Sequence, residues 1–205
     1  MSDKYNAFIA LRESLSFYYP ISDDTWYEFQ QICKFKSLKK QHVLYSIGDV
    51  PNSYAYVFKG LVRCFTCDEK GNEYNKIFFD EGMFPGSMAA LLTSTPSKLA
   101  CELLEDSLII EIDFMAYRAL MHKNKEIMLF QIYYLEKNWL LEKEAREIEI
   151  VQTDATARYL RFVAMYPVLV DRLPQYHIAS HLAITPTQLS RIRKSLLIQP
   201  IQSVL

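Results

Sequence analysis

The spacing of apolar positions changes period along the chain and predicts a β-rich part between two helical parts. Alternating or mostly apolar runs at 53–59, 61–67 and 73–79 lie between glycines that recur every 11 or 12 residues. Turn signals at this spacing are typical of antiparallel strands in a sandwich, roll or barrel. A further strand pair is expected from Cys101 to Ile112, bent at residues 105–107.

Before these strands the period is helical. Ser22 can cap a helix whose first turn holds Asp23 and Asp24, because acidic side chains stabilise the positive end of the helix dipole. Trp26, Phe29 and Cys33 continue this helix at helical spacing.

After Asp113 the chain is again helical in pattern, with no glycine or proline from about 114 to 148. We expect one long helix over 114–150. Its seam repeats at 4-3-4 spacing over about two heptads and consists of Met128, Ile132, Leu135 and Trp139. The seam favours a contact between subunits, and the alternative is a helix that covers its own β domain.

Residues 174–194 predict two short helices joined by a tight turn. The buried side of the first helix is expected to consist of Ile178, Ala179 and Leu182. Thr185 is a good N-cap for the second helix, and Pro186 stands at the first helical position, where its missing N–H costs nothing. This is the pattern of a helix-turn-helix whose second helix enters the major groove of DNA.

The second helix has a narrow apolar face of Leu189 and Ile192. Its other face carries the polar and basic residues Thr187, Gln188, Ser190, Arg191 and Lys194. The alternative is a small helical hairpin with a solvated charged face.

The distribution of charge supports DNA binding. The whole chain has a net charge of −1, but residues 153–205 contain six Lys or Arg against two Asp. This end is therefore basic, whereas the rest carries 17 basic and 22 acidic residues. A basic module on an acidic body fits a separate part that binds DNA with a strong dependence on salt.

Composition limits the class of protein. Half of the 205 residues are hydrophobic, which argues against disorder. No segment resembles a signal peptide, and no apolar run is long enough to span a membrane. We therefore expect a soluble, cytoplasmic protein with no membrane partner.

The cysteines and histidines give no sign of catalysis or of a metal site. Four cysteines in a chain of this size do not suggest a disulfide framework. Cys64 and Cys67 are three apart on a predicted strand, so their thiols should point to opposite faces and be structural. His177 and His181 are four apart, as in zinc peptidases, but the next residue is Ile178 rather than the glutamate base. We expect both histidines on the outer side of the first helix, and we do not expect an enzyme.

The order of these parts resembles the Crp/Fnr family of bacterial transcription regulators over nearly the whole chain. The matching segments are Ile47–Asp49, Val57–Arg63, Asp80–Phe84, Leu104–Ser107 and Ile178–Lys194. The resemblance implies an α+β fold with an N-terminal antiparallel β-roll of the double-stranded β-helix or jelly-roll type. A long dimerisation helix and an all-α helix-turn-helix domain would follow. The implied domains are residues 1–113, 114–150 and 151–205.

The resemblance also implies a function and partners. It implies a homodimer that binds palindromic double-stranded DNA, controls transcription through RNA polymerase and responds to a small molecule in the roll. Only eleven residues follow Lys194, so the β-hairpin wing common in the family is expected to be reduced or absent.

When the family's DNA-reading motif is matched residue by residue to this sequence, the resemblance implies that the recognition helix is Pro186–Leu196. Arg191 could bind guanine O6 and N7, and Gln188 could reach adenine. Thr185 and Lys194 are better placed for phosphates. Thr187 and Ser190 complete the expected DNA-binding set.

The effector site departs from the family. The expected site residues are Gly86, Ser87, Met88 and Lys98. Ser87 replaces the glutamate that holds the ribose of a cyclic nucleotide, and Lys98 is the only nearby cation where the family has an arginine. We therefore expect no cofactor and no cyclic AMP binding. The alternative function is a ligand-sensing or protein-interaction module whose helix-turn-helix does not bind DNA specifically.

Overall fold

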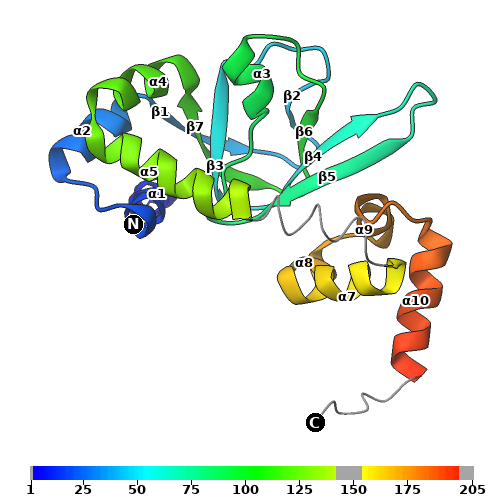
Figure 1. The fold of residues 1–205 in the computed structure, drawn as a ribbon. Coiled ribbons are helices and arrows are strands. Elements are labelled where there is room, and N and C mark those ends of the chain that lie inside the picture. Colours follow the sequence, from blue (N-terminus) through cyan, green and yellow to red (C-terminus); the bar gives the residue numbers. More distant parts are fainter. Residues whose placement is uncertain (1, 142–153, 199–205) are drawn as a thin grey trace. The chain divides into compact units, whose positions relative to one another are not determined.

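The computed structural model describes residues 2–141 and 154–198 (Figure 1). The chain forms two compact units. Unit 1 consists of residues 1–66 and 76–142, and unit 2 consists of residues 67–75 and 143–205.

Unit 1 is built around two sheets, which confirms the expected antiparallel β-roll. One sheet has the strand order β1-β7-β3 and the other has the order β2-β6-β4-β5. The pairs β1 with β7, β3 with β7, β2 with β6 and β4 with β6 are all antiparallel. The strands are β1 (Cys33–Leu38), β2 (Val43–Tyr45), β3 (Ser53–Lys59), β4 (Val62–Cys67), β5 (Glu73–Phe79), β6 (Ala100–Leu103) and β7 (Ser107–Asp113).

Both strands predicted between Cys101 and Ile112 are present, but they do not pair with each other. β6 and β7 occur at the expected places, but they belong to different sheets. The bend at 104–106 carries the chain from one sheet to the other, which a local pattern cannot distinguish from a hairpin. Strands β1 and β2 were not predicted.

Two hydrophobic clusters fill unit 1, and β3 contributes to both. Ala55 and Val57 face the cluster between the sheets, whereas Tyr54 and Tyr56 face the cluster under the helices. Alternate residues of a strand point to opposite faces. The buried residues between the sheets are Tyr45, Ala55, Val57, Val62, Cys64, Phe79, Cys101, Leu103 and Ile109.

One glycine is required by close packing in the roll. Gly60 has a φ of 117°, and a Cβ atom there would lie 2.1 Å from Ser107 Oγ. Glycine adopts this backbone region without steric cost, whereas a side chain does not.

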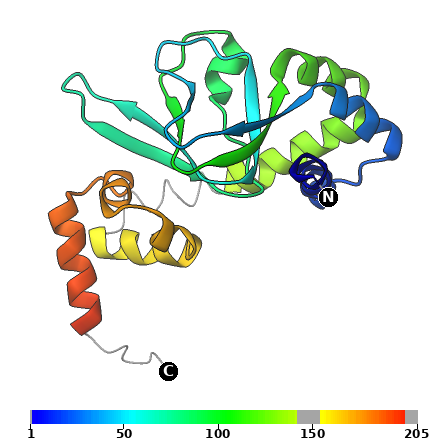
Figure 2. The same cartoon turned by 180° about the vertical axis from the view of Figure 1, so that it is seen from behind.

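The helices of unit 1 gather on one side of the three-stranded sheet, as the views from the front and from behind both show (Figures 1 and 2). They are α1 (Asp3–Tyr18), α2 (Asp23–Gln31), α4 (Phe114–Lys123) and α5 (Lys125–Leu135), followed by the π-helix η1 (Glu136–Leu141). The short α3 (Met88–Thr93) follows β5. Ser22 caps α2 as predicted, because its side chain accepts from the N–H of Thr25. Cys33, expected on this helix, is instead the first residue of β1.

The expected single helix over 114–150 is interrupted at Asn124. The backbone of Asn124 is extended, with φ −117° and ψ 114°, which ends α4. The Asn124 side-chain oxygen then accepts from the N–H groups of Glu126 and Ile127 and caps α5. Asparagine favours such caps because its short amide satisfies the first N–H groups of a helix. The part of the predicted helix after residue 141 lies outside the described residues.

Unit 2 contains four described helices and the tip of the β4–β5 hairpin. The helices are α7 (Ala155–Met165), α8 (Leu169–Arg172), α9 (Gln175–His181) and α10 (Pro186–Ile198). In the hairpin tip, Asp68 Oδ1 accepts from the N–H groups of Lys70 and Asn72, which closes the turn at Gly71. The segment that bears on the predicted absence of a wing, 199–205, lies outside the described residues.

Candidate DNA-reading helix and effector segment

The pair α9 and α10 has the apolar contacts that the sequence predicts. Ile178, Ala179 and Leu182 are buried, as expected for the inner side of the first helix. Leu189 of α10 is fully buried, and Ile192 is half-buried. These contacts orient α10 so that its apolar stripe faces α9 and its polar face is turned to solvent.

The turn between the two helices contains an unusual residue. Ala183 has a φ of 54°, in the left-handed region. The N–H of Ala183 donates to the Ser180 carbonyl, and the N–H of Ile184 donates to the Ala179 carbonyl, so the turn ends α9 in a closed form. A residue with a Cβ in this conformation costs about 1–2 kcal/mol.

The start of α10 is a capping box. The N–H of Gln188 donates to Thr185 Oγ1 over 3.1 Å, and Gln188 Oε1 accepts from the N–H of Thr185 over 2.9 Å. Such reciprocal bonds satisfy two N–H groups that the helix itself leaves without partners. The acceptor end of Gln188 is therefore engaged, and a two-bond contact with adenine requires Gln188 to leave the cap.

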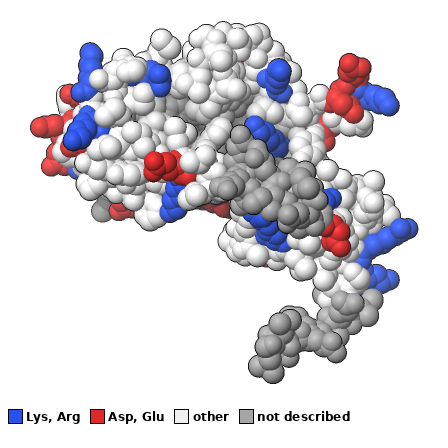
Figure 3. Space-filling model, viewed as in Figure 1, with Lys and Arg blue, Asp and Glu red and all other residues white. Residues whose placement is uncertain are grey.

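The exposed face of α10 carries the other residues that the sequence predicts for DNA binding. Thr187, Ser190, Arg191 and Lys194 are exposed, together with Thr185 and Gln188. Lys and Arg side chains project from α10 into solvent (Figure 3). Six exposed hydrogen-bonding side chains on one helix form a surface that could contact both bases and phosphates.

Within unit 2, the hairpin tip is hydrogen-bonded to α9 through Asn75. The Asn75 side chain is only 1% exposed, and its amide donates to the carbonyl of His177 over 3.2 Å. The backbone N–H of Asn75 donates to Ser180 Oγ over 3.0 Å, and Ser180 Oγ donates to the carbonyl of Glu73 over 2.8 Å. These bonds hold the position of α9 and, through it, the turn that leads to α10.

The expectation that both histidines lie on the outer side of α9 was wrong. His177 is buried and His181 is half-buried, and both contact Asn75. Since a carbonyl only accepts, His181 Nδ1 carries a proton in its bond to Asn75 O. Since the Asn75 amide donates to His177 Nδ1, the proton of neutral His177 is on Nε2. No sequence signal indicates this contact, because Asn75 lies about 100 residues earlier in the chain.

The predicted effector residues do not form one cluster. Ser87 is buried, and its hydroxyl is hydrogen-bonded to the buried hydroxyl of Ser97 over 2.9 Å. Lys98, next along the chain, is exposed. Gly86 packs so closely that a Cβ there would lie 2.8 Å from Tyr54 Cβ and 3.0 Å from the methyl group of Met88.

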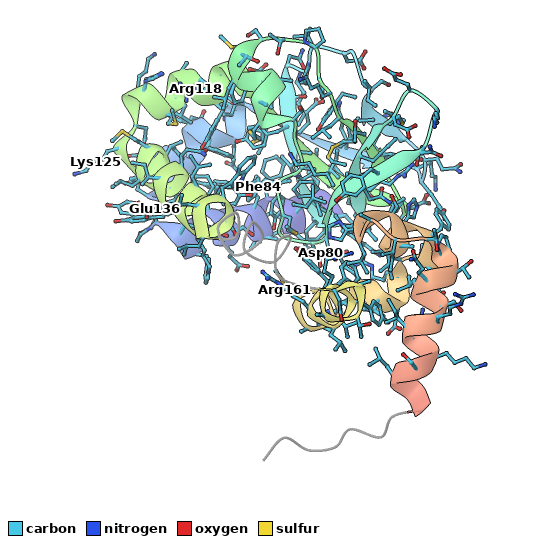
Figure 4. The ribbon with its side chains drawn as sticks, turned by 45° about the vertical axis from the view of Figure 1, so that its right-hand side comes forward. Asp80, Phe84, Arg118, Lys125, Glu136 and Arg161 are labelled. Atoms are coloured by element: carbon cyan, nitrogen blue, oxygen red, sulfur yellow. A yellow bond between two sulfur atoms is a disulfide. The ribbon has the colours of Figure 1, made fainter. Side chains whose placement is uncertain are left out.

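Just before this segment, Phe84 anchors it to the helices of unit 1. The Phe84 ring lies 5.2 Å from the ring of Tyr56 and 5.5 Å from that of Tyr134. Figure 4 shows Phe84 inside unit 1, whereas Lys125 lies on its outside. The segment 84–98 is thus tied to the helix α5 by aromatic contacts.

The predicted dimer seam lies on the opposite side of α5 and η1 from this core. Ile127 and Phe130 are buried against unit 1, while Met128, Ile132, Leu135 and Trp139 are 40–47% exposed. Tyr133, Leu140 and Leu141 extend the exposed apolar surface. Single exposed apolar residues are ordinary, but a run of this kind is typical of an interaction surface.

The cysteines differ from the expectation in one respect. Cys64 is buried and Cys67 is exposed, so the two thiols do point to opposite faces. Cys64 is also joined to Cys101 by a disulfide, which the sequence reasoning missed. The two residues lie opposite each other on β4 and β6, and this register depends on the sheet order.

The described part of the chain offers neither a cluster of metal ligands nor a membrane-spanning helix. Among these residues, no group of three or more His, Cys, Asp or Glu side chains could hold a metal ion. None of the described helices is long and apolar enough to cross a membrane.

The described chain thus combines a β-roll of two antiparallel sheets with the helix pair α9 and α10. Residues 35–124 match the family model of the cyclic nucleotide-binding domain. No curated protein matches the chain in sequence. The predicted resemblance to Crp/Fnr regulators is confirmed at the level of the fold by solved structures.

Three of these structures illustrate the likeness. The c-di-GMP responsive global regulator CLP of Xanthomonas campestris is 16% identical, with a TM-score of 0.69, and the match covers 86% of this chain and 92% of that chain. FixK2 of Bradyrhizobium japonicum is 16% identical, with a TM-score of 0.67 and coverages of 84% and 90%. The catabolite activator protein of Thermus thermophilus is 17% identical, with a TM-score of 0.55 and coverages of 90% and 87%.

Proposed function

We propose that this protein is a homodimeric transcription regulator that binds a palindromic DNA site through α10 and is controlled by an effector in the β-roll. The observation that carries the proposal is the exposed face of α10, where Arg191 and Lys194 stand beside hydroxyl and amide side chains. The fully buried Leu189 holds the opposite face against the module. Arg191 reads guanine, and Lys194 and Thr185 bind phosphates.

The exposed seam of α5 and η1 supplies the second subunit's contact. Two copies that pair along Met128, Ile132, Leu135 and Trp139 bury four half-exposed apolar side chains. A two-fold dimer presents two reading helices, which matches two half-sites related by the same symmetry. RNA polymerase is the further partner that a regulator of this kind requires.

The roll is proposed to take a small molecule other than cyclic AMP. A cyclic nucleotide needs a carboxylate for the ribose hydroxyl and a guanidinium for the phosphate. In this chain Ser87 is hydrogen-bonded to Ser97, and Lys98 is exposed. These side chains supply neither group.

The test is selection of DNA from a random pool, followed by gel shift of the selected sequence at several salt concentrations. A selected palindrome with half-sites about one helical turn apart, bound with a steep salt dependence, is the expected result. Failure to enrich any sequence, together with salt-independent weak binding, would contradict the proposal.

The oligomeric state is measured separately. Ile132→Glu is expected to convert a dimer into a monomer in sedimentation experiments, while the exposed Lys125→Glu on the same helix leaves the dimer intact. A wild-type monomer at all concentrations would contradict the dimer.

The second candidate function is a ligand-sensing or protein-interaction module that does not read DNA specifically. The engagement of Gln188 in the capping box favours it, because one of the two base-reading side chains is already used. The same gel shifts separate the two functions, since this module gives the same weak affinity for selected and random DNA.

A further inference from the structure

Cys64 and Cys101 form a pair of reactive groups that the proposed function does not use. They lie opposite each other on the adjacent strands β4 and β6, with their Cα atoms 4.4 Å apart, and the structure joins them by a disulfide. This separation lies within the range that disulfides adopt. Thirty-seven positions separate them in the sequence.

The strands stay aligned without help from the sulfur atoms. The neighbouring pair in the same register is Arg63 and Glu102, whose side chains form an ion pair with N···O distances of 2.8 and 2.6 Å. Both side chains are largely buried, and the Arg63 guanidinium also lies 3.9 Å from the ring centre of Phe65. Because backbone bonds and this ion pair fix β4 against β6, the two thiols remain opposite each other when the bridge is reduced.

Tyr45 covers the sulfur atoms from the edge of the sheet. Its hydroxyl lies 2.8 Å from Cys101 Sγ and 3.6 Å from Cys64 Sγ. A disulfide carries no hydrogen, so the Tyr45 hydroxyl is the donor, and burial raises the pKa of Tyr45 and keeps it protonated. Tyr45 belongs to β2, an edge strand of three residues with a shift in register. A short irregular edge strand opens at low cost and gives a small molecule access to the pair.

Cys67 indicates whether the bridge is permanent or reversible. Cys67 is a free, exposed thiol only three residues from Cys64. An exposed cysteine that stays a free thiol is typical of a protein in a reducing compartment. In such a compartment a disulfide is a transient product of oxidation rather than a permanent link.

We propose that Cys64 and Cys101 are a reversible redox site in the β-roll and that its substrate is a peroxide. One sulfur attacks a peroxide oxygen, which forms an S–O bond, breaks the O–O bond and releases hydroxide that takes the thiol proton to become water. The second sulfur then attacks the first, which forms the S–S bond and expels hydroxide that takes the second proton. Two thiols and one hydrogen peroxide thus give one disulfide and two water molecules. A dithiol reductant reverses the change by exchange.

The experiment uses the full chain carrying Cys67→Ser, which removes the exposed thiol. The reduced protein is treated with hydrogen peroxide, and free thiols are counted after alkylation under denaturing conditions. The count is expected to fall from three to one, to return to three with dithiothreitol, and to be three in protein purified with reductant. Cleavage after Arg63, Lys70, Lys98 and Arg118 places the bridge between two identifiable peptides.

Two further variants show which cysteines form the disulfide. Adding Cys33→Ser leaves bridge formation unchanged, because Cys33 is the first residue of β1, which belongs to the other sheet. Adding Cys64→Ser abolishes it, and circular dichroism checks that this variant is folded. Three thiols that persist after peroxide, a bridge that contains Cys33, or a bridge that dithiothreitol cannot open in the folded protein would each overturn the proposal. These measurements do not depend on DNA binding.

Discussion

The effector segment at 84–98 and the candidate reading helix α10 differ in where their polar side chains lie. In the effector segment, Ser87 and Ser97 are buried, and their hydroxyl groups are hydrogen-bonded to each other. In α10, Arg191 and Lys194 are exposed to solvent. A buried polar pair contributes to stability, whereas exposed polar groups on a rigid helix are available to a ligand. The comparison supports the proposal that α10 binds DNA, and it indicates that Ser87 and Ser97 stabilise the roll.

The largest effect is expected for Arg191→Ala in α10. The variant should lose about 1–3 kcal/mol of discrimination, roughly 5- to 150-fold, between a selected DNA site and random DNA. Gel shifts with both DNAs measure this ratio. Lys194→Ala is the matched control, because loss of a phosphate contact weakens both DNAs alike and lowers the salt slope by about one. Equal binding of the selected site by Arg191→Ala and the parent protein would refute the role of Arg191.

The hydrogen bonds from Asn75 to α9, the helix that positions α10, are tested by Asn75→Ala. The substitution leaves the carbonyl of His177 and the Nδ1 atom of its ring without the buried Asn75 donor. The free energy of unfolding should fall by about 1–3 kcal/mol in urea titrations. Hydrogen exchange should localise the loss to α9.

Glu69→Ala, in the exposed part of the same hairpin tip, is the control for Asn75→Ala. It should change the free energy of unfolding by less than about 0.5 kcal/mol. Similar losses for the two variants would show that the contact with α9 contributes little.

The effector segment is tested by Ser87→Ala. Loss of the bond to Ser97 should lower the free energy of unfolding by about 1 kcal/mol. Lys98→Ala should leave it within about 0.5 kcal/mol, because Lys98 is exposed. Added cyclic AMP should leave the Tm of the parent protein unchanged. A rise in Tm that grows with cyclic AMP concentration would show that the segment binds the nucleotide after all.

The smallest effect, and the only stabilising one, is expected for Ala183→Gly. Glycine relieves the left-handed backbone at φ 54°, but it also gains freedom in the unfolded chain. The net gain should be about 0.5 kcal/mol, measured as a rise in Tm. Ala179→Gly is the control, since Ala179 lies inside α9, where glycine costs about 1 kcal/mol. A loss of stability in Ala183→Gly would show that the turn does not strain this residue.

Much of the fold could be predicted wherever the signal is local. The strands at 53–59 and 73–79, the cap at Ser22 and the buried face of α9 follow from periodicity and capping residues, because each depends on neighbours a few positions away. The candidate reading face of α10 was predicted for the same reason. Asn124 was missed as a break, although its cap on α5 is also local, because no glycine or proline marked it.

The sequence by itself determined the order of elements, the resemblance to Crp/Fnr regulators and the polar face of α10. Only the tertiary structure decided that β6 and β7 separate into different sheets, that Cys64 faces Cys101, and that His177 and His181 contact Asn75. The contacts of these cysteines and histidines join residues 37 to 106 positions apart, so they depend on strand register and sheet order, which no local pattern encodes.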